Sequence, residues 1–362
     1  MADFDLTRLA VKMVCPTNEV ITDDKGMPGV YVQRNPRTLA ELVTGGDSSV
    51  HPAFLVGGQQ VTKLMIGKFQ GKSHNNRIYS LPGEDPTATI TLNTYETYCK
   101  NKGDGHHCIT AAEWAFLALC AKKDGKMPKG NNNYGKDTTE TAYVAIPSMA
   151  RDSSNRIQRV ATGTGPVTWS DTGDISGIWD LNGNVWEWVA GIRLVYGELQ
   201  VIPYNNAAEA SCDTSATSAE WRAINANATG YDNLFITPNG SGTTANSVKL
   251  DRVSGHWQWQ AAAITDQADE SRNSTFGSTT MSGLSAFCQM YMRAMALAPD
   301  GELAEYEGDV FYANNAAEER CAARGGGWNY GAGAGVFTLY FSYARSFSGT
   351  YFGGRPAFYE KQ

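Results

Sequence analysis

The segment at residues 177–189, which reads GIWDLNGNVWEWV, constrains the fold more than any other part of the chain. The Asn-Gly pair at 182–183 is typical of a tight turn, and aromatic residues stand on both sides of it. In an extended chain Trp186 and Trp188 share one face and Glu187 takes the other. One face can therefore bury two indole rings while the carboxylate reaches a partner elsewhere in the fold.

The segment at residues 324–358, RGGGWNYGAGAGVFTLYFSYARSFSGTYFGGRPAF, has an unusual composition. It consists almost entirely of Gly, Ala, Ser, Tyr and Phe, and its only charges are Arg324, Arg345 and Arg355. Tyr and Phe provide large, rigid contact areas, and Gly and Ser let the backbone adapt, as in antibody-type binding surfaces. We interpret the segment as a binding face that also serves the fold. Arg355 is expected to form a structural ion pair, with Glu187 as one candidate partner.

Several other segments predict regular structure. Residues 1–50 contain the runs LAVKMV and GVYVQR between turn residues, which predicts a small β-rich N-terminal module. The alternation within 52–71 predicts a hairpin of two strands. Thr110 and Glu113 form a capping box, which predicts a helix over 109–121.

The segment from about 198 to 290 has a different composition. Ala, Ser, Thr and Asn dominate it, its periodicity is weak and turn signals such as PNGSG recur. We interpret it as a long insertion and predict no local structure for it. A short helical piece is expected at 290–297, before the chain enters the terminal segment.

Composition excludes some classes of function. The net charge is -7, with 30 Lys plus Arg against 37 Asp plus Glu, so we expect no nucleic-acid partner. No run of about twenty apolar residues occurs, so no membrane insertion is expected. The first residues, MADFDLTRLAVKMV, lack the basic start and the apolar run of a signal peptide. These features predict a product made in the cytoplasm.

The seven cysteines show no CxxC pair and no spacing typical of a metal finger. We expect free, buried thiols, which pack as small apolar side chains. A pair between Cys99 and Cys108 remains an open alternative.

Five landmarks in order resemble the formylglycine-generating-enzyme-type branch of the C-type lectin fold. They are TAAEWAFLA, a Gly/Asn-rich loop at 122–137, GIWDLNGNVWEW, RGGGWN and GGRPAF. The resemblance implies an α+β, loop-rich fold with short antiparallel strands and few helices. It also implies a C-type lectin-like domain over 51–362 that follows the N-terminal module and is interrupted by the insertion. Gly354 departs from the family pattern, which has Phe in GFR.

The resemblance also names enzymes, which the residues argue against. Sulfatase-activating enzymes of this family carry a reactive cysteine pair in the region that corresponds to 324–355, and here that region has no cysteine. Its iron enzymes use clustered histidines, whereas His106 and His107 are adjacent and are expected to be solvated or to cap an element. A calcium-dependent lectin is the other alternative, but the segment offers no Asp or Glu as a ligand. We expect no catalytic residue, metal or cofactor.

The terminal segment resembles the variable region of proteins diversified by retroelements, which display it on this same scaffold. In that family an Asn-rich template is copied with its adenines randomised, which never yields Lys, Glu, Gln, Met or Trp. Residues 329–358 contain none of these five residue types. The resemblance implies twelve ligand-binding residues: Gly327, Asn329, Tyr330, Gly333, Tyr340, Phe341, Ser342, Tyr343, Phe347, Gly349, Tyr351 and Phe352.

Alternation supports a division between scaffold and face. If 336–342 is a strand, then Phe337, Leu339 and Phe341 fill the core while Tyr340 and Ser342 face a partner. The resemblance implies that the partner is a protein or glycan receptor on a target cell. It also implies a place in the phage tail of a virion, with a cytoplasmic or cell-surface displayed protein as the alternative. The N-terminal module is expected to serve attachment or homo-oligomerisation.

Overall fold

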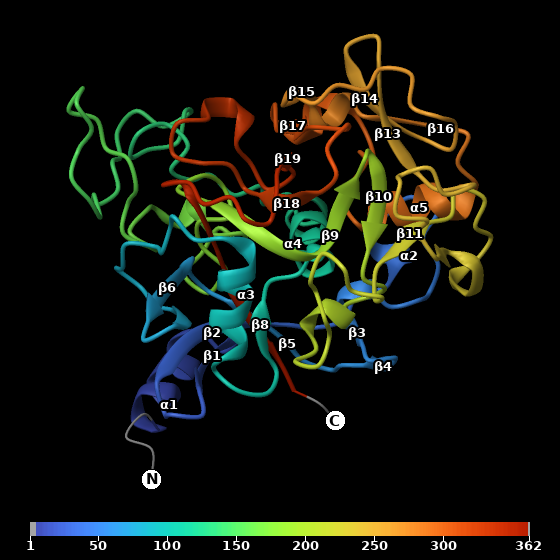
Figure 1. Cartoon of the computed structure of the whole chain (residues 1–362). Coiled ribbons are helices and arrows are strands. Elements are labelled where there is room, and N and C mark those ends of the chain that lie inside the picture. Colours follow the sequence, from blue (N-terminus) through green and yellow to red (C-terminus); the bar gives the residue numbers. More distant parts are fainter. Residues whose placement is uncertain (1–4, 361–362) are drawn as a thin grey trace.

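A computed structural model describes residues 5–360 as an α+β structure rich in loops. The predicted fold class is confirmed, because short strands far outnumber helices in this part of the chain (Figure 1). The helices are α1 (Asp5–Val14), α2 (Leu39–Leu42), α3 (Leu92–Lys100), α4 (Ala111–Lys123) and α5 (Ala286–Ala294). Among the described residues, no helix has both the length and the apolar character needed to cross a membrane.

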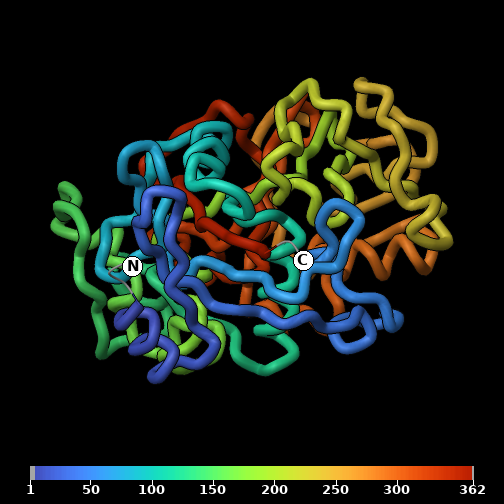
Figure 2. The backbone as a smooth tube through the Cα atoms, turned by 90° about the horizontal axis from the view of Figure 1, so that it is seen from below, coloured from blue at the N-terminus to red at the C-terminus, as the bar shows by residue number. Residues whose placement is uncertain are grey.

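A five-stranded sheet joins both ends of the chain. Its order is β1 (Asn18–Thr22), β2 (Pro28–Arg34), β5 (Leu64–Gly67), β21 (Pro356–Tyr359) and β8 (His106–Cys108). In Figure 2 the blue N-terminal segments and the last red strand lie in the same part of the molecule. β1 and β2 thus share one sheet with strands from beyond residue 50. This topology does not support a separate module that ends at residue 50.

The main sheet carries the terminal segment. Its path runs β15 (Arg272–Thr275), β17 (Val310–Ala313), β19 (Leu339–Tyr343), β18 (Arg320–Arg324), β9 (Trp186–Val195), β10 (Glu198–Val201), β13 (Lys249–Val253), β14 (His256–Gln260) and β16 (Thr280–Ser282). β20 (Phe352–Gly354) adds to β9 in parallel, and β11 (Arg222–Ile224) and β12 (Phe235–Ile236) extend β10. The segment at 198–290 therefore supplies strands to the main sheet. Local sequence patterns did not predict these strands, because they are defined by pairing with other strands of the sheet.

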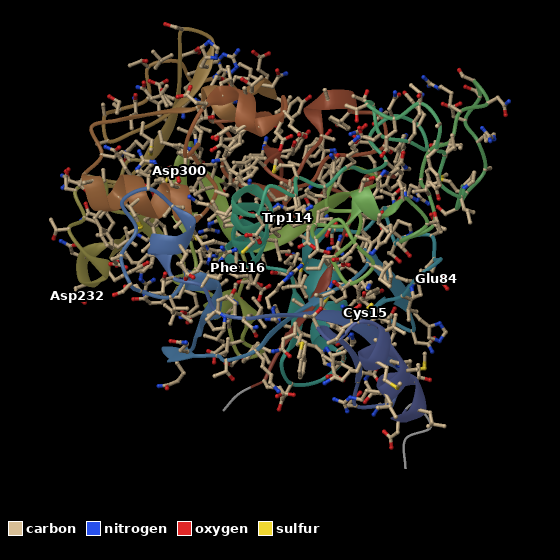
Figure 3. The ribbon with its side chains drawn as sticks, turned by 180° about the vertical axis from the view of Figure 1, so that it is seen from behind. Cys15, Glu84, Trp114, Phe116, Asp232 and Asp300 are labelled. Carbon is tan, nitrogen blue, oxygen red and sulfur yellow. The ribbon has the colours of Figure 1, made fainter. Side chains whose placement is uncertain are left out.

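Helix α4 is the predicted helix and lies in the middle of the molecule. The Thr110 side chain accepts a hydrogen bond from the Glu113 backbone, and Glu113 accepts one from Thr110, which confirms the capping box. Trp114 and Phe116 on this helix are buried at the centre of the fold (Figure 3). Trp114 donates its indole hydrogen to the carbonyl of Val336 at 2.8 Å, so the helix also holds the terminal segment.

Other predictions met mixed outcomes. The hairpin at 52–71 forms as β3 (Leu55–Val56) and β4 (Gln59–Gln60), and the described structure adds a second one from β6 (Gly71–His74) and β7 (Arg77–Ser80). The predicted helical piece at 290–297 begins earlier, as α5. All seven cysteines are free, so the alternative pair of Cys99 and Cys108 does not form.

The prediction that LAVKMV is a strand was wrong, because residues 9–14 belong to helix α1. Six residues are too short a run to separate a period of two from a period of 3.6. The run also continues a helical spacing of apolar residues that begins at Leu6. GVYVQR, by contrast, lies in β2 as predicted.

The turn at 182–183 leads into the centre of the main sheet. Gly183 has φ +76°, and a Cβ there would lie 2.2 Å from the carbonyl oxygen of Asn131, so only glycine fits. Trp186 and Trp188 are fully buried in one cluster, and Glu187 lies on the other side of β9. The predicted alternation of this segment is therefore confirmed.

Glu187 forms the predicted ion pair with Arg355. The guanidinium donates from Nη2 to Oε1 at 2.7 Å and from Nε to Oε2 at 3.0 Å, and both side chains are fully buried. Arg355 also donates to the carbonyls of Gly67 and Trp179, and Gln70 donates to Glu187. Burial raises the pKa of the Glu187 carboxyl, and the nearby Arg355 charge opposes that rise. The pair joins the terminal strands to β9 and to the five-stranded sheet.

Candidate binding face

The terminal segment crosses the main sheet between two loops. It leaves β18, passes through a short 3-10 turn at Gly331–Gly333, forms β19 and returns through a second loop to β20. In Figure 1 the red part of the chain around β18 and β19 lies in the upper half of the molecule. Backbone hydrogen bonds frame it: Gly331 donates to Asn132, Tyr134 donates to Trp328, and Thr89 donates to Gly349.

Aromatic rings of this segment gather around Trp186 and form what we call the aromatic cluster. Its inner rings are buried and its outer rings are half-buried. The inner rings are Trp186, Trp188, Tyr340 and Phe352, and the outer rings are Tyr312, Tyr330, Tyr343, Phe347 and Tyr351.

Trp186 is the centre of the inner rings. Its ring centroid lies 4.9 Å from Tyr340 and 5.0 Å from Tyr330, with the Tyr330 ring perpendicular at 90°. Phe352 is nearly parallel to it, with centroids 6.0 Å apart. These offset and edge-on arrangements are the favoured geometries of aromatic pairs, so the inner rings form a stable base.

The outer rings cover this base and reach the surface. Tyr343 stacks on Phe347 with centroids 3.5 Å apart and planes 11° apart. Tyr351 lies 5.4 Å from the inner ring of Phe352 and 6.0 Å from Trp328. Each of these three rings packs on one side and meets solvent on another, as binding surfaces rich in Tyr require.

The structure sorts the twelve predicted residues by exposure. Asn329 is exposed; Tyr330, Gly333, Tyr343, Phe347, Gly349 and Tyr351 are half-buried; Gly327, Tyr340, Phe341, Ser342 and Phe352 are buried. The first two groups are accessible to a ligand in this conformation, and the third is not.

Two predicted ligand-binding residues belong instead to the interior. Phe341 is fully buried in the main core, where its ring lies 6.3 Å from Phe311. Phe352 is fully buried beneath Tyr343 and Phe347. Both residues were predicted to bind the ligand only because they occupy template-like positions. Such a position does not indicate which face of a strand the side chain lies on.

The alternation along β19 is confirmed, but the predicted exposure of Tyr340 and Ser342 was wrong. Leu339 and Phe341 lie in the main core, and Tyr340 lies on the opposite side, in the aromatic cluster. That side is covered as well: Tyr340 is 5% exposed and Ser342 is 7% exposed. Ser342 accepts a hydrogen bond from Ser271, which belongs to the 198–290 segment.

The sequence prediction missed Tyr312, which comes from β17 and not from the terminal segment. β17 pairs in parallel with β19 and places Tyr312 opposite Tyr340, with ring centroids 5.4 Å apart. Tyr312 also lies 6.0 Å from Tyr330. Its sequence surroundings, VFYA, indicate a strand, but only the pairing of the strands brings it to the aromatic cluster.

Four tyrosine hydroxyls of the aromatic cluster keep their protons at neutral pH. Burial raises the pKa of Tyr330 to about 12 and raises the pKa values of Tyr312, Tyr340 and Tyr351. At neutral pH these phenols are therefore neutral groups that can donate and accept hydrogen bonds.

A buried carboxyl anchors the loop before β19. Asp309 accepts a hydrogen bond from the Phe337 backbone at 2.7 Å, and a Cβ on Gly335 would lie 1.9 Å from its Oδ1. Burial raises the pKa of Asp309 to about 8. At the other end of β19, Arg345 donates to both oxygens of Glu319.

The raised pKa of Asp309 predicts that the protein loses stability as the pH rises. Its pKa is higher in the folded chain than the usual 3.8, so its contribution is greatest at low pH and is lost as the pH rises through about 8. Between pH 6 and about 8.5 we expect a loss of roughly 2–3 kcal/mol. Urea unfolding should show this loss in the wild type and not in Asp309→Asn, and parallel pH profiles would contradict it.

The histidine prediction needs correction, because His106 and His107 are buried and not solvated. His107 lies 2.7 Å from Glu113, through Nε2, and 2.9 Å from the Gly105 carbonyl. His106 packs against Phe358, and burial lowers its pKa to about 3. Within residues 5–360, no three His, Cys, Asp or Glu side chains come together as metal ligands would.

The cysteine chemistry of the sulfatase-activating enzymes does not fit this face. The cysteine next to the terminal segment, Cys321, is buried against the aromatic cluster on β18, and burial raises the pKa of its thiol.

The departure from the family pattern at Gly354 has a structural reason: a Cβ there would lie 2.8 Å from the ring of Tyr95, which fills that space.

Comparisons with known proteins agree with the sequence resemblance. Residues 38–197 match the model of the sulfatase-modifying factor enzyme 1-like domain, so the resemblance is confirmed over that stretch. No curated protein sequence matches the chain.

Similar solved structures include PvdO from Pseudomonas aeruginosa, at 12% identity and a TM-score of 0.37, covering 94% of this chain and 98% of that one. They also include Treponema denticola variable protein 1, at 12% identity and a TM-score of 0.37, covering 95% and 99%. The P3c variant of Major Tropism Determinant is 9% identical with a TM-score of 0.30, covering 94% of this chain and 71% of that one.

Proposed function

We propose that this protein is a non-enzymatic binding protein that presents a hypervariable, retroelement-diversified surface on a C-type lectin-type scaffold. Its ligand is a protein or glycan receptor on the surface of a target cell. The observation that carries the proposal is the convergence of template-like positions on the inner rings. Tyr330, Tyr343, Phe347 and Tyr351 come from two loops and one strand; Tyr330 packs on Trp186 and the other three pack on Phe352.

The division of labour within the aromatic cluster supports this proposal. The inner rings are buried, and two of them, Trp186 and Trp188, come from β9, outside the terminal segment. The outer rings are accessible and rest on this fixed base, so exchanging them alters contacts and leaves the sheet in place. Tyr, which supplies three of these four template-like outer rings, is also enriched among the residues that carry most of the binding energy in protein interfaces.

We further propose that the protein acts in the tail of a phage virion and sets which host is recognised. A protein displayed on a cell surface or held in the cytoplasm is the alternative context. The N-terminal residues would attach the protein to the particle or join copies of it.

The diversification part of the proposal has a genomic test. We expect a near-identical, Asn-rich repeat of the terminal segment and a reverse transcriptase beside the gene. A sequenced neighbourhood with neither feature would remove the support for diversification while leaving a fixed binding face untouched.

The binding part is tested with intact cells. Labelled protein should bind a subset of a panel of bacterial strains, and the triple change Tyr343→Ser, Phe347→Ser and Tyr351→Ser should weaken that binding by about 100-fold or more. Val253→Ser, an exposed position on β13, is the matched control and should bind like the wild type. Equal binding by the triple variant, or stoichiometric copper or iron bound at the terminal segment, would overturn the proposal.

A further inference from the structure

Helix α1 is oriented with its charged side toward the protein and its apolar side toward solvent. Arg8 and Lys12 both form ion pairs with Glu19 on β1. On the other side Leu6 is 80% exposed, Leu9 56%, Met13 76% and Val14 67%. No residue of this helix is buried.

This arrangement reverses the usual placement of a surface helix, whose apolar stripe faces the core. Leu6, Leu9, Ala10 and Met13 have the i, i+3, i+4, i+7 spacing of one continuous stripe. The ion pairs fix the direction of the stripe, because turning it inward would leave Glu19, which is 6% exposed, without both cations. A contiguous exposed stripe of this kind marks an interaction surface.

We propose that this stripe is the interface of a two-fold homodimer in which α1 of one copy packs antiparallel against α1 of a second copy. Asp5 and Lys12 are seven residues apart and therefore lie on the same flank of the stripe, near opposite ends. A two-fold axis across an antiparallel pair brings equal flanks together with their directions reversed. Asp5 of each copy then lies near Lys12 of the other, and the helix dipoles oppose each other favourably.

The same charges disfavour a parallel pair. A two-fold axis along the helices brings the flank with Asp5 and Lys12 of one copy against the opposite flank of the other copy. Thr7 lies on that opposite flank, which offers no charged side chain to pair with Asp5 or Lys12. Lys12 contacts Glu19 at 2.5 Å, but its side chain remains 48% exposed. It can therefore pair with Glu19 of its own copy and with Asp5 of the second copy at the same time.

The size of the stripe sets the expected strength of the dimer. Covering it on both copies would bury on the order of 1,000 Å², below the usual range for stable complexes. We therefore expect a dissociation constant on the order of 10 μM.

The position of α1 suits such a dimer. It lies at the bottom of Figure 1, whereas β18 and β19 of the terminal segment lie toward the top, so a dimer leaves both binding faces free. Two faces in one particle strengthen weak individual contacts through multivalency. The inference deepens the oligomerisation part of the proposed function, and its failure would leave the receptor-binding part standing.

The first experiment measures mass by sedimentation over about 1–200 μM protein. The wild type should shift from monomer to dimer, and Leu9→Glu with Met13→Glu should stay monomeric at every concentration. Val253→Glu is the matched control, since Val253 is also an exposed apolar residue, 39% exposed, but lies on β13. A monomeric wild type at 200 μM, or a dimer in the double variant, would overturn the proposal.

The second experiment tests the antiparallel direction. The middle of the stripe lies between Leu9 and Ala10, so oxidation should cross-link Ala10→Cys between copies beyond the wild-type background, and Leu6→Cys should not cross-link. Asp5→Lys should weaken the dimer about tenfold by placing like charges together. Efficient cross-linking through Leu6→Cys would contradict the geometry. Binding of the full-length protein to neutral phosphatidylcholine vesicles through α1, without dimer formation, would also overturn the proposal.

Discussion

Replacing Arg355 by Met is expected to lower the free energy of unfolding by about 3–5 kcal/mol. The change leaves Glu187 in a fully buried site with one remaining side-chain donor, Gln70. It also removes the hydrogen bonds that Arg355 gives to the carbonyls of Gly67 and Trp179. Urea unfolding at pH 7, followed by circular dichroism, measures the loss.

A double change separates the ion pair from its surroundings. Because Arg355→Met strands a buried charge, adding Glu187→Gln should recover part of the lost stability, and the two effects should be strongly non-additive. The matched control is Arg156→Met, which breaks a surface pair with Asp152 and a contact with the Tyr134 ring and should shift the unfolding midpoint far less than Arg355→Met. Additive effects of the two buried changes would show that the pair does not act as a unit.

The short segments with strong local signals were predicted correctly because their chemistry is local. The capping box of α4 needs only two side chains three residues apart, and the alternation about Glu187 needs only an extended chain. The partner of Glu187 was predictable as well, since a buried carboxylate requires a cation and the terminal segment contains only three.

What the sequence could not supply was the arrangement of strands far apart in the chain. Tyr312 joins the aromatic cluster only because β17 pairs with β19, and Ser342 is covered by Ser271 from the 198–290 segment. Neither contact can be predicted from the local spacing of apolar and polar residues. For the same reason the outward side of β19 was predicted to be free, although a second layer of rings covers it.

The second large effect concerns the boundary between the inner and outer rings. Tyr340→Ser is expected to lower the free energy of unfolding by about 3 kcal/mol, because Tyr340 is 5% exposed and packs against Trp186, Tyr312 and Tyr343. Phe347→Ser should cost only about 1 kcal/mol, since that ring is half-buried and leaves no closed cavity. Thermal and urea unfolding of the two variants give the comparison directly.

Binding should show the opposite order. Phe347→Ser removes a ring that a ligand can touch, so it should change which cells are bound while the fold persists. Tyr340→Ser should act on binding only through the outer rings that rest on it, so Tyr340→Phe, which keeps the ring, should restore both stability and binding. If Tyr340→Phe kept stability but lost binding, its hydroxyl would contact the ligand directly, and the boundary between inner and outer rings would have to move inward to include it.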